Sequence, residues 1–229
     1  MKTLLLYTSH RQLEEVRLSS YFYNKSDFLK QMDVILHCNN EKIDKQKLKQ
    51  NFDLFDTPNK EIIFSNKNSG HHSGVAQAID SIYNKLLEYD FVVHLHPDVL
   101  ILDPANLQAT LEKNYNSDTD FIVWQIHKTL GMPHGHERNV EYASDFFIFR
   151  PKEENNIFKQ HADYWKGNQG KSGCERFLFL MIDKFNLITS KLDRDPVGGM
   201  LLSPEPFGLW HCHKPHEAVL YIEKDFKNA

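Results

Sequence analysis

The sequence has few cysteines, no excess of charge of one sign and no long apolar run, and each shortage excludes a class of protein. Its three cysteines, Cys38, Cys174 and Cys212, are widely spaced and odd in number. That pattern does not describe a disulfide framework and favours a reducing compartment. The 27 basic and 31 acidic residues nearly cancel, to a net charge of −4. We therefore expect no nucleic-acid partner, because the basic footprint of such proteins is missing.

No apolar stretch approaches the roughly 20 residues that a membrane span requires. The apolar run after Met1 is too short for a secretory signal, and no small-residue cleavage site follows it. We expect a cytoplasmic protein without a transmembrane segment, which leaves peripheral docking on a membrane open. With 229 residues, of which 41% are hydrophobic, the chain is long enough for one domain with a substantial core. The oligomeric state has no signature in the sequence.

The first hundred residues alternate between short apolar runs and amphipathic helical patterns. The runs cover residues 3–7, 32–37, 61–64 and 91–96, and the helical patterns cover 13–29, 41–52 and 75–88. This order predicts an α/β fold with a mostly parallel central sheet flanked by helices. A polar loop follows each strand, so the loops meet at one edge of the sheet.

The second half has a different pattern, ahead of a loop-rich tail from residue 193. It predicts helices over residues 106–113, 154–165 and 174–185, and strands over 120–126 and 142–150.

Residues 90–102, Asp-Phe-Val-Val-His-Leu-His-Pro-Asp-Val-Leu-Ile-Leu, are the most informative stretch of the chain. His94, His96 and Asp98 alternate along it, so they would share one face of a straight strand. Pro97 cannot donate to a central ladder and predicts the end of that strand. Asp98 would then lie at the carboxyl edge of the sheet, where open α/β sheets bind their ligands.

This apolar strand running into His-Pro-Asp-Val-Leu-Ile resembles the Asp-x-Asp-Val-Leu-Ile motif of GT-A fold glycosyltransferases, with His96 in place of the first carboxylate. The resemblance covers most of the chain in layout and is specific around residues 90–102 and 208–216. It implies one GT-A-like (Rossmann-like) domain over residues 1–229, with a nucleotide-sugar-binding half (1–102) and an acceptor half (103–229).

The resemblance implies a hexosyl- or deoxyhexosyltransferase of the bacterial or large-virus glycan-building type. Its partners would be a nucleotide-sugar donor, most commonly UDP-linked, and a hydroxyl acceptor on a glycan or another molecule. A divalent cation would neutralise the charge that develops on the departing diphosphate. Asp98 is the expected carboxylate ligand, and His96 would either ligate the cation or hydrogen-bond the donor. An imidazole ligand favours Mn²⁺ over Mg²⁺.

The C-terminal Trp-His-Cys-His-Lys-Pro, residues 210–215, resembles the closing motif of several GT-A families. The resemblance implies that His211 or His213 completes the metal site and that Lys214 pairs with phosphate as a point charge. The spacing does not rank the two histidines.

Two loops are expected to bind the donor. The segment Asn-Ser-Gly-His-His-Ser-Gly over residues 68–74 opens a helix. Its glycines let the backbone approach a ligand, and a helix N-terminus favours anions. The turn after the first strand lies where GT-A enzymes bind the nucleobase and ribose. The donor-binding candidates are Thr8, Ser9, His10, Asn68, Gly70, Gly74, His96 and Lys214.

Two carboxylates, Glu175 and Asp145, are candidate catalytic bases. An inverting transferase needs a carboxylate to accept the proton of the acceptor hydroxyl, and a helix N-terminus often presents one. Glu175 follows Gly173 at the start of a predicted helix, which resembles the acidic residue that opens the acceptor-side helix of inverting GT-A enzymes. We rank Glu175 above Asp145, although an acidic residue at this position also stabilises a helix through its dipole.

Two other functions compete with this interpretation. His94, His96 and Asp98 are also spaced like the ligands of a zinc-dependent metallo-hydrolase, with His211 and His213 as further ligands. That family expects histidine where this chain has Val99, and an antiparallel β-sandwich in place of strand–helix alternation. The missing first carboxylate also suits a non-catalytic nucleotide-sugar-binding module.

Overall fold

A computed structural model of the chain describes residues 1–65, 73–127, 140–167, 173–193 and 209–212. Its centre is a seven-stranded sheet with the strand order β3-β2-β1-β4-β7-β6-β8. Neighbouring strands pair in parallel except at β7, which is antiparallel to both β4 and β6. The strands are β1 (Thr3–Ser9), β2 (Asp33–Cys38), β3 (Lys60–Phe64), β4 (Phe91–Leu95), β6 (Phe121–His127), β7 (Val140–Phe149) and β8 (Thr189–Asp193). The predicted mostly parallel α/β sheet is confirmed.

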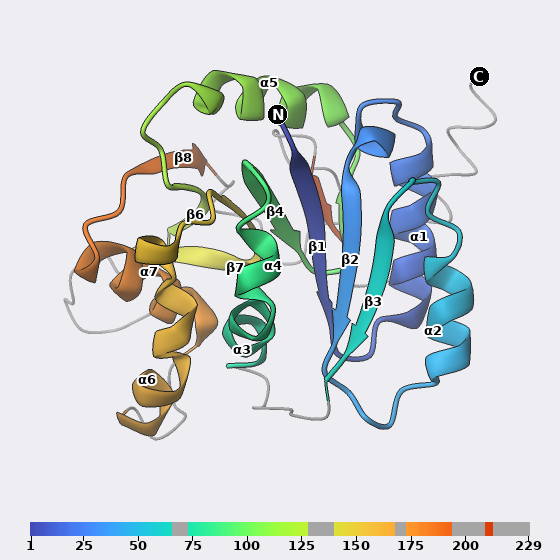
Figure 1. Cartoon of the computed structure of the whole chain (residues 1–229), viewed down its shortest axis with the longest axis horizontal. Coiled ribbons are helices and arrows are strands. Elements are labelled where there is room, and N and C mark those ends of the chain that lie inside the picture. The colour runs from blue at the N-terminus through green and yellow to red at the C-terminus, as the bar shows by residue number, and fades with distance from the viewer. Residues whose placement is uncertain (66–72, 128–139, 168–172, 194–208, 213–229) are drawn as a thin grey trace.

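Helices cover both faces of this sheet (Figure 1). One face packs against α1 (Leu13–Asn24), α2 (Lys45–Phe52) and α5 (Pro104–Tyr115). The other packs against α3 (Gly74–Ser81), α4 (Tyr83–Leu86), α6 (His161–Gly167) and α7 (Cys174–Lys184). In the part of the chain that the structure describes, three 3₁₀ turns complete the helical segments: η1 (Leu29–Gln31), η2 (Glu153–Asn155) and η3 (Ile157–Gln160). Among the described residues, no helix is long and apolar enough to cross a membrane.

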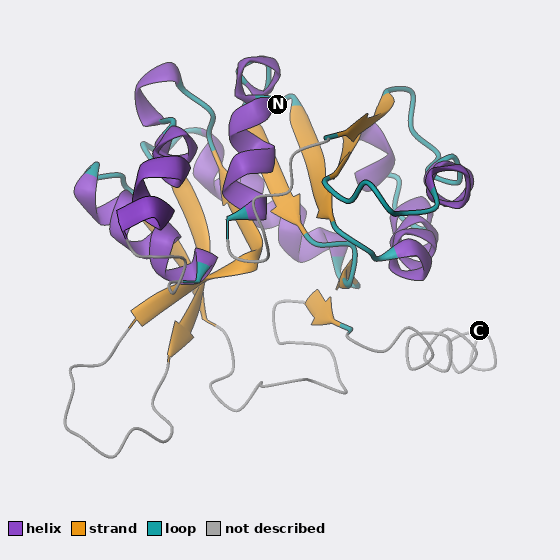
Figure 2. Cartoon of the chain, turned by 90° about the horizontal axis from the view of Figure 1, so that it is seen from below, coloured by secondary structure: helices purple, strands orange, loops and turns teal. Residues whose placement is uncertain are grey.

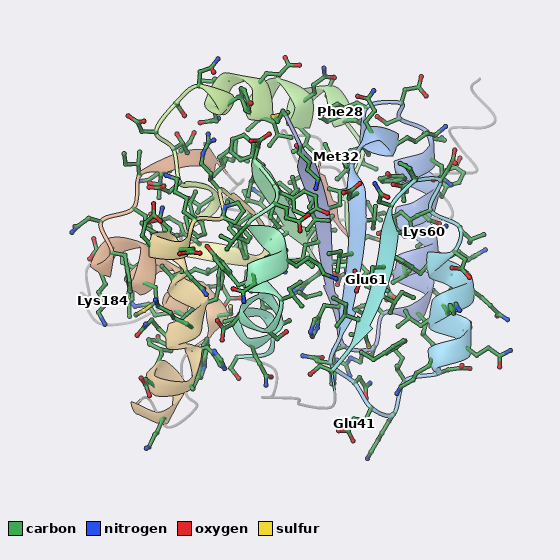
Figure 3. All side chains as sticks on the ribbon, in the orientation of Figure 1. Phe28, Met32, Glu41, Lys60, Glu61 and Lys184 are labelled. Atoms are coloured by element: carbon green, nitrogen blue, oxygen red, sulfur yellow. The ribbon has the colours of Figure 1, made fainter. Side chains whose placement is uncertain are left out.

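The central strands are apolar on both faces because helices bury both faces. Every residue of β1 and β4 is buried, as expected for parallel strands inside an α/β sheet. The edge strand β3 differs, since Lys60 and Glu61 are exposed on it (Figure 3). Exposed charges on an edge strand oppose pairing with another chain.

Two predicted helices are interrupted in the structure. The helix predicted over residues 75–88 is divided into α3 and α4 at Ile82, whose backbone leaves the helical region. Ser81 precedes this break, and its hydroxyl donates to the carbonyl of Ala78 at 2.7 Å, a contact that bends helices. The helix predicted over residues 154–165 is instead η2, η3 and α6, because Asn156 caps η3 through its side chain.

Two strands of the C-terminal part were not predicted from the sequence, one that ends where the loop-rich tail begins and one inside that tail. β8 extends the main sheet beside β6, and β9 (Leu209–His211) pairs with β5 (Val99–Ile101) in a separate two-stranded antiparallel sheet. β5 directly follows the turn that ends β4, so residues 90–102 form two strands in two different sheets.

A buried histidine gives folding a testable pH dependence. His37 on β2 is 2% exposed, and burial lowers its pKa to about 4. Below pH 6.5, His37 therefore binds a proton in the unfolded chain, whereas in the folded chain it binds one only when the pH falls to about 4. Within that window, acidification should lower the free energy of unfolding by up to about 1.4 kcal/mol per pH unit.

The variant His37→Gln isolates this effect, because glutamine does not titrate and can still bond the Ser81 hydroxyl that His37 Nε2 contacts at 3.2 Å. Urea unfolding between pH 7.5 and 4 should show a shallower decline in the variant than in the wild type. Parallel curves for the two proteins would contradict the assignment.

Candidate functional site

The polar ends of the parallel strands meet at the carboxyl edge of the sheet. Figure 2 looks onto this edge, with helices on either side of the strands. Ser9 ends β1 and His10 follows it, Asn39 follows β2, and His96 follows β4. The common direction of β1, β2 and β4 brings these residues together, although long stretches of sequence separate them.

The loops after β1 and β2 are joined by hydrogen bonds. The Asn39 N–H donates to the Ser9 carbonyl at 3.2 Å, and Asn39 Oδ1 lies 3.1 Å from His10 Nδ1. A Cβ atom at Gly74 would lie 2.7 Å from Asn39 Nδ2, so the start of α3 lies directly beside the Asn39 side chain. Asn39 was not predicted as a site residue, and its only signal was its place after an apolar run.

Thr8 lies deeper than its predicted donor-binding role requires. It is buried, and its Oγ1 lies 2.9 Å from His94 Nε2. His94 is fully buried, and its ring packs on Phe147 with centroids 4.4 Å apart. Burial lowers the pKa of His94 well below its usual value, so the imidazole is neutral. Thr8 and His94 therefore connect β1 and β4 below the edge. Ser9 is buried as well, and its hydroxyl donates to Gln12 Oε1 at 3.2 Å, so His10 is the exposed one of the three donor-binding candidates here.

The turn after β4 is held by its neighbours. β4 ends at Leu95, as Pro97 predicts. The His96 N–H donates to the Asp145 carbonyl at 2.9 Å, and the Val99 N–H donates to the His96 carbonyl at 3.0 Å. From α1, Ser19 Oγ donates to the Pro97 carbonyl at 2.7 Å. The position of Asp98 is thus set by β7, α1 and its own turn.

The C-terminal segment reaches this turn through the small sheet. Val99 pairs with His211 across β5 and β9, and the Cys212 N–H donates to the Asp98 carbonyl at 2.7 Å. The backbone of the predicted closing motif therefore lies beside Asp98. Only the backbone of His211 is described, and Asn68, Gly70, His213 and Lys214 lie outside the described residues.

A second carboxylate, Glu15 on α1, lies close enough to Asp98 for the two charges to interact. Glu15 precedes Ser19 by one helical turn and so lies on the same side of α1. Burial raises the pKa of Glu15, and the neighbouring charges of Asp98 and Glu14 add to the rise. Glu15 was not predicted, because a helical pattern does not show which turn will face a distant loop. The pair gives this part of the edge a negative potential that favours a cation.

The described donor atoms suit a cation that is shared with a ligand. Among the described side chains, no three of the types His, Cys, Asp and Glu come together as metal ligands. Asp98 supplies one carboxylate and His96 one imidazole at the same turn. Mg²⁺ is commonly bound by one or two carboxylates together with substrate phosphates, not by an all-protein cage. This donor set therefore fits such a cation and does not by itself form a closed structural zinc site.

A bulge in β7 contains one candidate base, Asp145, and contacts the other, Glu175, through Ser144. Val123 pairs with Phe147 and Gln125 pairs with Tyr142, so four β7 residues, 143–146, stand opposite the single residue Trp124. Bulges bend a strand and redirect its side chains, often beside active sites. Asp145 lies in this bulge, and its charge acts on His94 while its carbonyl holds the His96 N–H.

Glu175 lies beside the same bulge, at the start of α7, which runs against β7 (Figure 1). Its Oε1 accepts a hydrogen bond of 2.7 Å from Ser144 Oγ. Ser144 is the residue before Asp145, so two consecutive residues of β7 connect Glu175 and the His96–Asp98 turn. Ser144 was not predicted, since its sequence context is that of an ordinary strand.

The seven-stranded sheet with one antiparallel strand, the two helical layers and the small second sheet form the GT-A-like α/β fold predicted from the sequence. No protein-family model matches the chain, and no curated protein matches it by sequence. Solved structures do match it in fold. Of the three compared below, one is named a mannosyltransferase, one is named a glycosyltransferase, and the third is TarS.

S. aureus TarS (residues 1–349) superimposes with a TM-score of 0.53 and 14% identity, over 84% of this chain and 58% of that one. The mannosyltransferase PcManGT from Pyrobaculum calidifontis, solved with GDP-Man and Mn²⁺, gives 0.53 and 8%, over 84% and 55%. The glycosyltransferase GlyE of Streptococcus pneumoniae TIGR4 gives 0.54 and 12%, over 84% and 45%. This chain therefore spans about half the length of the structures it matches, and at these identities the likeness establishes the fold alone.

Proposed function

We propose that this chain is a glycosyltransferase that moves a sugar from a nucleotide-sugar donor to a hydroxyl of a glycan or another acceptor, with the help of a divalent cation. One observation carries the proposal. In a GT-A-like fold, the turn bearing Asp98 is held between α1, β7 and β9, at the edge where the β1 and β2 loops also end. Ligands of open α/β sheets bind at this edge.

The residues divide into a donor group and a cation group. Thr8, Ser9, His10 and Gly74 are the donor-binding candidates at the part of the edge expected to receive the nucleoside, and we add Asn39, which lies beside His10 and Gly74. Asn68, Gly70 and Lys214 stay in the predicted donor set on sequence grounds. Asp98 and His96, completed by His211 or His213, would hold the cation against the diphosphate. Mn²⁺ is the favoured ion because imidazole is a softer ligand than oxygen, and UDP is the favoured nucleotide.

In an inverting transfer, the acceptor oxygen forms a bond to the anomeric carbon while the bond from that carbon to the diphosphate breaks. The bonding electron pair leaves with the diphosphate, whose charge the cation neutralises when bound. The acceptor proton passes to a carboxylate, for which Glu175 is the first candidate and Asp145 the second. We further propose a hexosyl or deoxyhexosyl group as the sugar and the cytoplasm as the compartment.

A thermal-unfolding screen tests this proposal. Nucleotides and nucleotide-sugars are each added with Mn²⁺, Mg²⁺, Zn²⁺ or EDTA, and a ligand that binds only the folded chain raises the melting temperature by mass action. One nucleoside diphosphate should stabilise the chain with Mn²⁺ and lose that effect in EDTA. Stabilisation by Zn²⁺ alone, with every nucleotide silent, would favour the metallo-hydrolase, although His94 is buried and bonded to Thr8.

A measurement of turnover distinguishes a glycosyltransferase from a non-catalytic nucleotide-sugar-binding module. Release of nucleoside diphosphate from the stabilising nucleotide-sugar, to water or to a glycan acceptor, is expected of a transferase. Binding of the donor without any such release would identify a non-catalytic module, which is the function that the absent first carboxylate favours.

A further inference from the structure

We propose that Ser144 is a positioning residue that orients the Glu175 carboxylate, with the glycine at position 173 leaving the space this orientation needs. The inference rests on the proposed function, in which Glu175 is the first candidate base. It adds to that function two residues which act only through Glu175.

The contact between Ser144 and Glu175 is suited to fixing a carboxylate. Ser144 is 7% exposed, and its hydroxyl donates to Glu175 Oε1 at 2.7 Å. Hydrogen bonds to a charged acceptor are shorter and stronger than bonds between neutral groups. A buried hydroxyl also has little access to water as an alternative acceptor. Ser144 therefore favours one position of Oε1 and leaves the other oxygen of the carboxylate to act on a ligand.

Gly173 limits the same carboxylate from the other side. Its φ of −70° and ψ of 164° are open to any residue, so its backbone conformation does not require glycine. A Cβ atom at this position would, however, lie 2.5 Å from Glu175 Oε2. A side chain at position 173 would therefore displace the flexible end of Glu175, and with it the carboxylate, from its present orientation.

The bulge in β7 connects this orientation with the cation site. Ser144 holds Glu175, and the next residue, Asp145, holds the His96 N–H through its carbonyl. The four bulged residues stand opposite one residue of β6, so their positions follow from the bulge and not from regular strand pairing. One irregular segment thus fixes the candidate base relative to the turn that carries Asp98.

The test measures release of nucleoside diphosphate from the donor found in the thermal screen. Ser144→Ala should lower kcat about ten- to a hundredfold, the usual range for losing a charge-assisted hydrogen bond, with KM for the donor within about twofold. Ser144→Thr, which keeps the hydroxyl, should restore most of the rate. Gly173→Ala should also lower kcat, by displacing the carboxylate. Ser20→Ala, which removes another buried hydroxyl, in α1, should not change kcat.

The double variant Ser144→Ala/Glu175→Gln decides whether Ser144 acts through Glu175. It should be no slower than Glu175→Gln alone, because the two residues form one unit. A further tenfold loss in the double variant, or full activity of Ser144→Ala beside a slow Glu175→Gln, overturns the positioning role while the proposed function stands. Binding of nucleotide-sugars without release by the wild type overturns both. Melting temperatures check folding, and if Ser144→Ala fails to fold, an unchanged kcat in Gly173→Ala overturns the inference.

Discussion

Replacing Asp98 by alanine is expected to lower the cation-dependent release of nucleoside diphosphate by at least about a hundredfold. The cation supplies several kcal/mol of charge stabilisation in the transition state, and each 1.4 kcal/mol is a factor of ten in rate. Asp98 lies at the turn that α1, β7 and β9 hold in place, and it is the carboxylate of the motif. Steady-state kinetics with Mn²⁺ titrated from an EDTA-treated sample should show both a lower maximum rate and a weaker apparent affinity for the cation.

Asp118→Ala is the matched control, because it removes the same charge from an exposed position at the end of α5. It should leave the rate and the cation dependence unchanged. Asp98→Asn separates charge from shape, since the amide keeps the size of the side chain and loses its negative charge. Full activity of Asp98→Ala in the presence of a chelator would remove Asp98 from the cation site and would point to a transferase that works without a metal.

The layout of the first half was accessible from the sequence because each of its strands is a continuous apolar run ended by polar residues. Pro97 was informative in the same way: a proline that cannot donate to the ladder ends β4 at Leu95, and Asp98 follows at the edge. The interruption at Ile82 was not accessible, because the apolar period continues through it. At the break, the Ser81 hydroxyl donates to the Ala78 carbonyl and also contacts His37 on β2, and the apolar period indicates neither contact.

The surroundings of the site were harder to predict, because they depend on contacts between distant residues. Ser19 binds the Pro97 carbonyl across 78 positions of sequence, and helical periodicity does not indicate which loop a given turn will meet. The pairing of β5 with β9 brings the backbone of the C-terminal motif beside Asp98, as predicted. The metal-ligand roles of His211 and His213 stay predictions. The sequence of β7 gives no sign of the bulge, so the contact of Ser144 with Glu175 could not be predicted from it.

Glu175→Gln is expected to lower kcat by about a hundred- to ten-thousandfold, the usual contribution of a general base, while the donor binds as before. Glutamine is close in size to glutamate, and its carbonyl oxygen can still accept from the Ser144 hydroxyl that contacts Glu175 at 2.7 Å. The substitution therefore removes the proton acceptor and leaves its surroundings in place. Titration of the donor by thermal shift measures binding, and single-turnover kinetics measure chemistry.

Asp145→Asn is the companion variant. Asp145 lies in the β7 bulge beside Ser144, and its backbone carbonyl, which the substitution keeps, accepts from the His96 N–H. If Glu175→Gln keeps the full rate and Asp145→Asn loses it, the base is Asp145, whose charge already acts on the buried His94. If both variants keep the full rate, neither carboxylate accepts the proton, and the transfer does not depend on a base from this edge.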